Sequence, residues 1–510
     1  MVILSFVFSN LWVFSGTALA LYFGASAYYQ LFLSPLRHIP GPWYAAVSEL
    51  WIITHVLRFR QCRAVQELFE KYGPIVRYAP NKVAYCDAVS NGRIYMNTRF
   101  EKSQFYKSLL WRVNESDHAM TSLPHAEHAP RRRAFAPHYT PSNIALFQPD
   151  IHKSVLELVE ILEVVNGEKP INCLHYFREM LVDIICSTSF SYNSGALQAR
   201  AAGVEYHPLV HAIDDFPIRG ILRAVVPKSM WELLGEIPHQ RWKLLYDSDA
   251  ILAKFVGARV KHMRAQMQDG KLQEVEKVPL VQRLLEYRLP SGEPMEEKNI
   301  IAEHLGHFIA GVDTTATTIS YALWELSRRP DIARRLRAEV DSAMHDPKTI
   351  PDISVLNSLS FLTAVIKETL RVYGAVPSLL ERVVPSEGID LLGCNIPSGT
   401  VITTQSWSLH RKVDVFPSPN TYLPDRWVDA DPDNLREMEA HMMPFGIGQR
   451  VCVGQHFAYQ SLRIVLAVIA RNFDIYVPPE TSDRSMEVRD AFVAFPASGC
   501  CCLVLTPRKS

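Results

Sequence analysis

The most informative segment of this sequence is Phe445-Gly446-Ile447-Gly448-Gln449-Arg450-Val451-Cys452-Val453-Gly454. An apolar run with helical spacing follows it, from Phe457 to Ala470. A cysteine that precedes a helix lies beside unpaired backbone N–H groups, which stabilise its thiolate form. The glycines permit a tight loop that a large flat cofactor can approach, and Arg450 offers a permanent cation for an acidic group. The alternative is a core cysteine beside a glycine-rich turn.

The decapeptide resembles the haem-binding loop of the cytochrome P-450 monooxygenases. This resemblance implies that Cys452 is the axial thiolate ligand of the iron in haem b (iron protoporphyrin IX). It also implies that Phe445, Arg450 and Gly454 belong to the cofactor-binding loop. The sequence departs from the family at Ser461, where many members have Glu.

A second motif, Glu368-Thr369-Leu370-Arg371, places Glu368 and Arg371 on one helix face. Alone, such a pair is most often a solvated surface ion pair. Here Pro424-Asp425-Arg426-Trp427 resembles a downstream element of the same family. The resemblance implies that Arg426 completes a buried Glu–Arg–Arg cluster that holds the cysteine loop.

A third motif, Ala310-Gly311-Val312-Asp313-Thr314-Thr315, lies within a long apolar helical pattern. A glycine and polar residues there cost helix propensity, so they need a reason. A helix kink without a ligand is one alternative. In the family this segment crosses the distal haem face, which implies that Gly311 leaves room for dioxygen. Asp313 and Thr314 would then be the catalytic residues that deliver protons.

Other site residues are expected from the same resemblance. His128 and Arg132 match a family Trp-x-x-x-Arg pattern whose side chains meet a haem propionate, and Arg382 is a further propionate-binding candidate. His307 is seven residues before Thr314 and is expected on the same helix face. It is either a substrate-binding group or a satisfied core histidine. Ala310 and Val376 are the other expected pocket residues.

The N-terminus predicts a membrane anchor. Met1 to Leu36 contains no Asp, Glu, Lys or Arg, and Leu11 to Leu33 is long enough to cross a bilayer as a helix. A cleaved signal peptide would have a basic n-region, and a core helix would have a polar face. Basic residues after the anchor favour a single-pass protein of the endoplasmic reticulum membrane with a cytosolic body. The expected divisions are an anchor (1–34), a proline-rich hinge (35–42) and one catalytic domain (43–510).

The rest of the chain predicts a mainly α fold with small β-sheets (α+β). Apolar residues recur with helical spacing in several segments, whereas strand-like runs are short. The expected helices are 144–164, 251–267, 295–328, 331–343 and 359–373, and the expected strands are 75–78, 83–86 and 401–405. Residues 218–234 mix apolar and basic side chains, which fits either an interfacial membrane contact or a half-buried helix pair.

Composition limits the functions. The 53 basic and 53 acidic residues cancel, which argues against a nucleic-acid-binding protein. The nine cysteines form no C-x-x-C pair, which disfavours zinc ribbons and dithiol redox motifs. No flavin or nicotinamide motif is recognisable, so electrons must come from a partner.

The function implied by the resemblance is monooxygenation of a lipophilic small molecule, with dioxygen and electrons from an NADPH–cytochrome P-450 reductase. The H-I-P-G-P-W segment at His38 is similar to fungal secondary-metabolism members. By family analogy the segments that line the pocket are largely apolar, which suits a lipophilic, terpenoid-like substrate, with a sterol or a polyketide as alternatives. Two alternatives stay open. One is a haem-thiolate isomerase or dehydratase that does not use dioxygen. The other is a non-catalytic haem-binding membrane protein.

Overall fold

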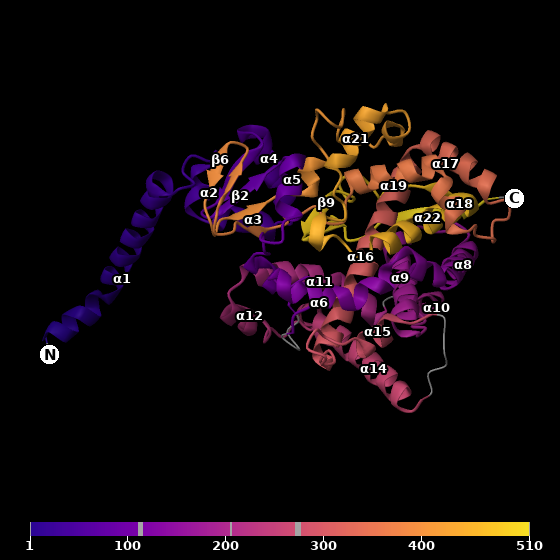
Figure 1. Ribbon diagram of the computed structural model, residues 1–510, viewed down its shortest axis with the longest axis horizontal. Helices are drawn as coiled ribbons and strands as arrows, with labels where there is room; N and C mark the ends of the chain where they lie inside the picture. The colour runs from indigo at the N-terminus through magenta and orange to yellow at the C-terminus, as the bar shows by residue number, and fades with distance from the viewer. Residues whose placement is uncertain (1, 111–115, 205–206, 271–276, 509–510) are drawn as a thin grey trace.

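The computed structural model describes residues 2–110, 116–204, 207–270 and 277–508, with side chains from residue 15 onward. Figure 1 shows a body of packed helices and small sheets, from which helix α1 (Val2–Tyr28) projects as an arm. A π-helical turn, Tyr29–Leu33, ends this arm. Within the described residues, no helix combines the length and apolar character that crossing a bilayer requires.

Helices make up most of the described body, as the sequence predicts. They are α2 (Trp43–Val47), α3 (Leu50–Leu57), α4 (Gln61–Tyr72), α5 (Ala88–Tyr95), η2 (Gln104–Leu109), α6 (His125–Phe135), η3 (Ala136–Tyr139), α7 (Pro141–Leu146), α8 (Gln148–Val165), α9 (Cys173–Phe190), α10 (Ala196–Ala201), α11 (Pro208–Val225), α12 (Lys228–Leu234), α13 (Gln240–Tyr246), α14 (Ser248–Gln268), α15 (Leu280–Glu286), α16 (Glu297–Arg328), α17 (Pro330–Ala343), α18 (Ile353–Ser358), α19 (Ser360–Val372), α20 (Ser406–Leu409), η4 (Pro424–Trp427), α21 (Pro432–His441), η5 (Gly448–Arg450) and α22 (Gln455–Asn472).

The strands form small, separate sheets in the described part of the chain. The strands are β1 (Ile75–Ala79), β2 (Lys82–Tyr85), β3 (Ile171–Asn172), β4 (Arg382–Val383), β5 (Ile389–Leu391), β6 (Cys394–Ile396), β7 (Val401–Thr403), β8 (Phe473–Tyr476), β9 (Val488–Ala491), β10 (Val493–Pro496) and β11 (Cys502–Pro507). The largest sheet has the order β1-β2-β7-β4, and the others pair β3-β11-β8, β10-β9 and β5-β6. In the largest sheet β2 and β7 are parallel, whereas the other pairs are antiparallel. The expected mainly α fold with small sheets is confirmed.

Most expected helices occur with their ends shifted by a few residues, but two expected segments are divided. The segment 144–164 is split between α7 and α8, and Pro149 lies in the first turn of α8. Proline lacks an N–H and disfavours helical geometry in the preceding residue, so a new helix begins there. Residues 218–234 form two helices, the end of α11 and α12, which are separated at Val226-Pro227, and this matches the helix pair that was one of the two alternatives for the segment. Trp231 of α12 is buried, whereas Leu233 is exposed.

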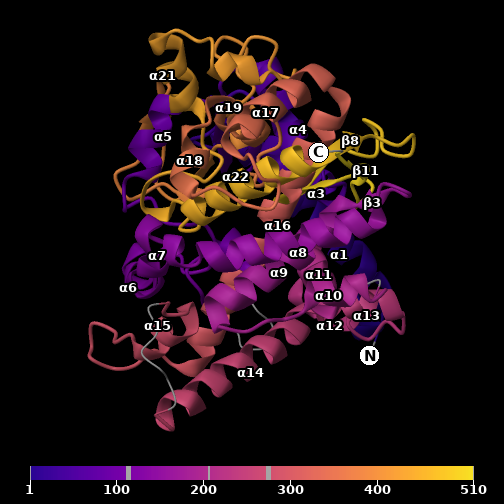
Figure 2. The same cartoon turned by 90° about the vertical axis from the view of Figure 1, so that its right-hand side faces the viewer.

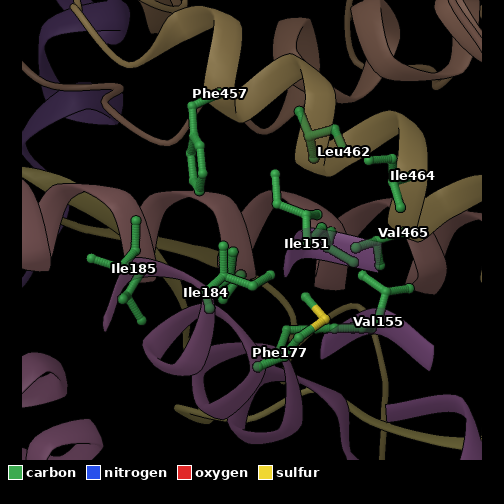
Figure 3. Close-up of a cluster of buried hydrophobic side chains, with 14 of the residues drawn as sticks. Ile151, Val155, Phe177, Ile184, Ile185, Phe457, Leu462, Ile464 and Val465 are labelled. Atoms are coloured by element: carbon green, nitrogen blue, oxygen red, sulfur yellow. The ribbon is translucent and has the colours of Figure 1, made fainter. Parts of the chain in front are cut away.

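Helix α16 lies at the centre of the body. Its buried residues occur on nearly every face, and it packs against α9, α14, α19 and α22, as the two ribbon views show (Figures 1 and 2). The same core contains α8. Figure 3 shows side chains of α22 facing those of α8 and α9, and the labelled ones are Phe457, Leu462, Ile464, Val465, Ile151, Val155, Phe177, Ile184 and Ile185. This packing fixes the helix that begins after Cys452 against α16.

The segment 35–42 that follows α1 is not helical and packs on the body. Leu36 and Ile39 are buried against the core that includes Ile75 and Val83. The Arg77 N–H donates to the Pro40 carbonyl at 2.7 Å. The arm is therefore joined to the body by a segment that is bound to strand β1.

Candidate active site

The cysteine loop is closed by its own backbone. The Cys452 N–H donates to the Phe445 carbonyl at 2.8 Å, and the short 3₁₀ turn η5 lies between them. Helix α22 begins at Gln455, with Gly454 as its N-cap residue. The sequence-predicted position of Cys452, immediately before a helix, is present in the structure.

Gly448 must be glycine for a steric reason. Its φ is +71°, and a Cβ at this position would lie 2.2 Å from the Tyr95 carbonyl oxygen. Gly446 has a similar φ of +69°, but a Cβ there would meet no atom within 4 Å. The close approach of the loop to the end of α5 therefore requires glycine at position 448, whereas it does not require glycine at position 446.

The Cys452 thiol experiences opposing influences. Burial raises its pKa, whereas a hydrogen bond from the Gly454 N–H and the charge of Arg132 lower it, and the net pKa is raised. The backbone N–H groups at the start of α22 thus lower the pKa of Cys452, as expected from the sequence, but this effect is smaller than the increase caused by burial. The Cys452 side chain is exposed, although enough protein lies around its thiol for burial to raise its pKa. A bound metal cation would remove the thiol proton.

Helix α16 has an accessible stripe in its otherwise buried middle. Ala310 is exposed and Gly311 and Thr314 are half-buried, whereas Ile309 and Val312 are buried. An exposed alanine in a buried helix requires open space beside it. The Thr314 hydroxyl donates to the Ala310 carbonyl at 2.6 Å, so its oxygen remains available as an acceptor.

Gly311 has a packing role in this structure. A Cβ at this position would lie 2.8 Å from Cδ1 of Ile185, which is on α9. The glycine therefore allows α16 and α9 to approach closely. This contact is a reason for glycine that the sequence motif did not indicate.

Asp313 does not share the accessible stripe with Thr314. It is buried, and its Oδ1 accepts hydrogen bonds from Nε and Nη2 of Arg178 at 3.1 and 2.5 Å. Sequence analysis missed Arg178, which lies on α9. This ion pair joins α16 to α9.

His307 lies on the predicted face and has a partner that sequence analysis also missed. Its Nδ1 is 3.0 Å from the Tyr139 hydroxyl, and the two rings are stacked. Burial lowers the pKa of His307, so its imidazole is neutral. The charge of Cys452, after burial, raises the pKa of Tyr139, which shows that Tyr139 lies near the cysteine loop.

A cluster of basic side chains lies beside the cysteine loop. Its members are Lys102, His128, Arg132, Arg382 and Arg450. Burial first, and then the other cations of the cluster, lower the pKa values of Lys102, His128 and Arg450, the last to about 10. His128 Nδ1 is buried and has no hydrogen-bond partner among the described residues. Sequence analysis missed Lys102, which has no motif of its own.

Main-chain carbonyls hold much of this cluster in place. Arg450 donates to four carbonyls of the segment before α6, those of Ala119, Ser122, Leu123 and Pro124. Lys102 donates to the Met120 carbonyl at 2.7 Å, and Arg132 donates to the Val451 carbonyl at 2.7 Å. These bonds neutralise no charge, so the cluster retains its excess of positive charge.

The structure brings Glu368, Arg371 and Arg426 together in the protein interior. Arg371 donates to both Glu368 carboxylate oxygens at 2.8 and 2.9 Å, and Arg426 Nε donates to one of them at 3.1 Å. Trp427 Nε1 and the Leu423 N–H also donate to this carboxylate. Arg371 uses its remaining donors on three backbone carbonyls. Asp425 instead pairs with Arg335.

Side chains from three distant segments of the chain meet in one apolar cluster. Val376 and Phe105 pack against a core that contains Tyr106, Leu123 and Phe492. These residues come from the segments 105–123, 376–380 and 492–496, which are far apart in the chain. The Glu to Ser difference at Ser461 leaves a buried Oγ without a partner in the described part of the chain.

Comparisons with known proteins agree with this geometry. The family model described as Cytochrome P450 matches residues 44–502. Cytochrome P450 monooxygenase ABA2 of Pyricularia oryzae is 28% identical over 458 residues, which cover 87% of this chain and 85% of that protein. Averantin hydroxylase of Dothistroma septosporum is 26% identical over 472 residues, 90% of this chain and 84% of that protein. Cytochrome P450 monooxygenase stcB of Emericella nidulans is 28% identical over 487 residues, 93% and 89% respectively.

The chain belongs to the cytochrome P450 family. It is a P450 monooxygenase, an oxidoreductase, in keeping with the names of these fungal relatives. The family implies a haem-thiolate cofactor, and the residues present fit it. Cys452 supplies an accessible thiol, the basic cluster supplies uncompensated positive charge for acidic groups, and open space lies beside Ala310.

The two loop glycines give a matched test. Gly446→Ala should cost only the strain of a left-handed alanine, about 1 kcal/mol. Gly448→Ala carries the same strain and also collides with the Tyr95 carbonyl, which should add about 1–3 kcal/mol. Thermal unfolding of the two variants beside the wild type measures the difference, and equal losses would contradict the steric argument.

The buried carboxylate gives a second test. Glu368→Gln keeps the shape but leaves Arg371 and Arg426 without a counter-charge, which should lower the free energy of unfolding by about 3–5 kcal/mol. Arg334→Ala, which removes an exposed ion pair with Asp331, is the control and should have little effect. Urea unfolding compares the two, and a similar small loss in both variants would refute the structural role of Glu368.

Proposed function

We propose that this chain hydroxylates or otherwise oxidises a lipophilic small molecule of secondary metabolism, using dioxygen and electrons that originate from NADPH. The observation that carries the proposal is the combination of an accessible Cys452 thiol with the open stripe at Ala310 and Thr314 of α16. The names of the fungal relatives, which include a hydroxylase, support the reaction class. The apolar cluster around Val376 and Phe492 supports a lipophilic, terpenoid-like substrate.

In this proposal the cofactor is haem b. When bound, it supplies the oxidative chemistry that amino-acid side chains lack. Cys452 is its ligand, and Phe445 and Gly454 belong to the loop that carries this ligand. Arg132, Arg382 and Arg450 balance its acidic groups, because the repulsion between these cations is relieved by an anion. His128 is neutral, because burial lowers its pKa, and it contributes a hydrogen bond through its unpartnered ring nitrogen.

The polar residues of α16 manage protons. Thr314 Oγ1 is free to accept a hydrogen bond at the accessible stripe, because its own proton is donated to the Ala310 carbonyl. Asp313 holds negative charge in its ion pair with Arg178 and is the proton carrier once it leaves that pair.

The electron donor in this proposal is a NADPH–cytochrome P450 reductase. Arg133 and Arg436 are exposed and available for an acidic docking face. Arg131, two residues before Arg133, instead pairs with the buried Glu303 at 3.1 Å.

We also propose that residues 1–34 anchor the protein in the endoplasmic reticulum membrane, with 35–42 as the connecting segment and 43–510 in the cytosol. The uncharged N-terminus and the projecting arm support this arrangement, as do the exposed side chains of Leu19, Leu21 and Phe23 (Figure 1). An interfacial contact through Met230 and Leu233 of α12 is consistent with it. A protein released from membranes by an alkaline carbonate wash would contradict the anchor.

The reduced protein with carbon monoxide should show the red-shifted Soret band of a thiolate-ligated haem, and Cys452→Ala should abolish it. A wild-type protein without this band would refute the assignment of Cys452. A band without NADPH- and reductase-dependent oxygen uptake would instead favour an isomerase, a dehydratase or a non-catalytic haem protein.

Thr314→Ala should separate oxygen use from product formation. The substitution removes the hydroxyl at the accessible stripe. Oxygen uptake should therefore continue, while hydrogen peroxide release should rise several-fold. Thr318→Ala is the control, because it removes the same kind of hydroxyl-to-carbonyl bond one turn further along α16. Equal peroxide release from both variants would contradict the role of Thr314.

A further inference from the structure

One buried guanidinium group contacts two carboxylates, the buried Asp313, which accepts its hydrogen bonds, and the half-buried Asp214, which forms an ion pair with it. Arg178, on α9, is buried and contacts Asp313 of α16 at 2.5 Å and Asp214 of α11 at 2.8 Å. The three helices are therefore joined by a single cation. The motif at residues 310–315 gives no indication of Arg178 or Asp214.

The charges around Asp214 leave it close to its titration point. Burial raises its pKa, Arg178 lowers it, Asp313 and Asp215 raise it, Arg241 lowers it, and the result is about 7. These groups come from α9, α16, α11 and α13. His175 of α9 also faces Asp214, at 3.9 Å. Burial lowers the pKa of His175 to about 4, so this imidazole is neutral near pH 7.

Helix α11 connects this ion cluster with a cavity. Its Ile221 and Val225 line a cavity of about 350 Å³ together with residues of α3 such as Ile52 and Val56. Asp214 and these cavity-lining residues thus lie on the same helix.

We propose that Asp214 is a positioning residue for proton transfer, because it competes with Asp313 for Arg178 and so sets how firmly Asp313 is held away from Thr314. This inference rests on the monooxygenase function proposed above. When Asp214 is ionised, the guanidinium is divided between two carboxylates and Asp313 is more easily released. When Asp214 is protonated, Arg178 binds Asp313 alone and Asp313 stays in its ion pair.

The chain offers a close control. Asp215 is the next residue on α11 and also carries a buried carboxylate, but it pairs with Arg241 and not with Arg178. Asp214→Asn removes the competing charge, Asp214→Glu restores it, and Asp215→Asn removes a charge that Arg178 does not contact. The comparison separates competition for Arg178 from a general loss of charge on α11.

The kinetic experiment uses the haem-loaded enzyme with the reductase and NADPH, without added substrate, between pH 6 and 8.5. Oxygen uptake and hydrogen peroxide release are measured. Asp214→Asn should slow the proton-dependent release of peroxide on the order of threefold to tenfold at pH 8, where the wild-type Asp214 is ionised. At pH 6 it should have little effect. Asp214→Glu and Asp215→Asn should keep the wild-type dependence on pH.

A stability experiment does not depend on turnover. Because the folded-state pKa of Asp214 is raised, its contribution to stability is full below the unfolded value and is lost as pH rises through 7. Asp214→Asn removes this dependence. A double-mutant cycle of Asp214→Asn and Asp313→Asn should show coupling at pH 8 and near additivity at pH 5.5, where Asp214 is already neutral.

The outcomes are distinguishable. Equal slowing by Asp214→Asn at every pH, or a wild-type profile in this variant, overturns the positioning role. Additivity of the cycle at pH 8 overturns the sharing of Arg178. No oxygen uptake by the wild type contradicts the proposed function, and the catalytic part of this inference with it. The cycle then decides the coupling of Asp214 and Asp313 independently.

Discussion

The buried carboxylate of Glu368 organises the part of the chain that leads to the cysteine loop. It accepts hydrogen bonds from Arg371, Arg426, Trp427 and the Leu423 backbone, so one anion joins α19 to η4. An unpaired buried carboxylate would be very costly, and these donors make its burial possible. Arg371 extends the same network to backbone carbonyls at residues 410, 419 and 421. Residues 410–427, which precede the cysteine loop in the chain, are therefore held against α19 by this network.

Helix α16 combines two roles that place opposite demands on its sequence. Its packing against α9 and α22 requires apolar or small side chains, while the stripe at residues 310–314 requires open space and polar groups. The two demands are met on different faces. Gly311 allows the approach of α9, Asp313 is buried in an ion pair, and Thr314 remains accessible. Adjacent residues of one motif thus have separate surroundings.

The sequence predicted the features that depend on local spacing and did not predict partners from distant segments. Glu368 and Arg371 are three residues apart on a helix, so their contact follows from helical geometry. Arg178 and Asp313 are 135 residues apart, and Tyr139 and His307 are 168 apart. Such contacts depend on how whole helices pack. The break at Pro149 could have been recognised, because proline near the start of a helix is a known boundary signal.

The basic cluster is fastened to residues 119–124 through backbone carbonyls, and every amino acid provides a backbone carbonyl. Arg450 and Lys102 would keep these acceptors whatever side chains the segment carried, provided that the backbone path is retained. The same segment belongs to the region that packs towards Phe492 and Val376. The side chains of residues 119–124 can therefore vary while Arg450 and Lys102 keep their positions beside the cysteine loop.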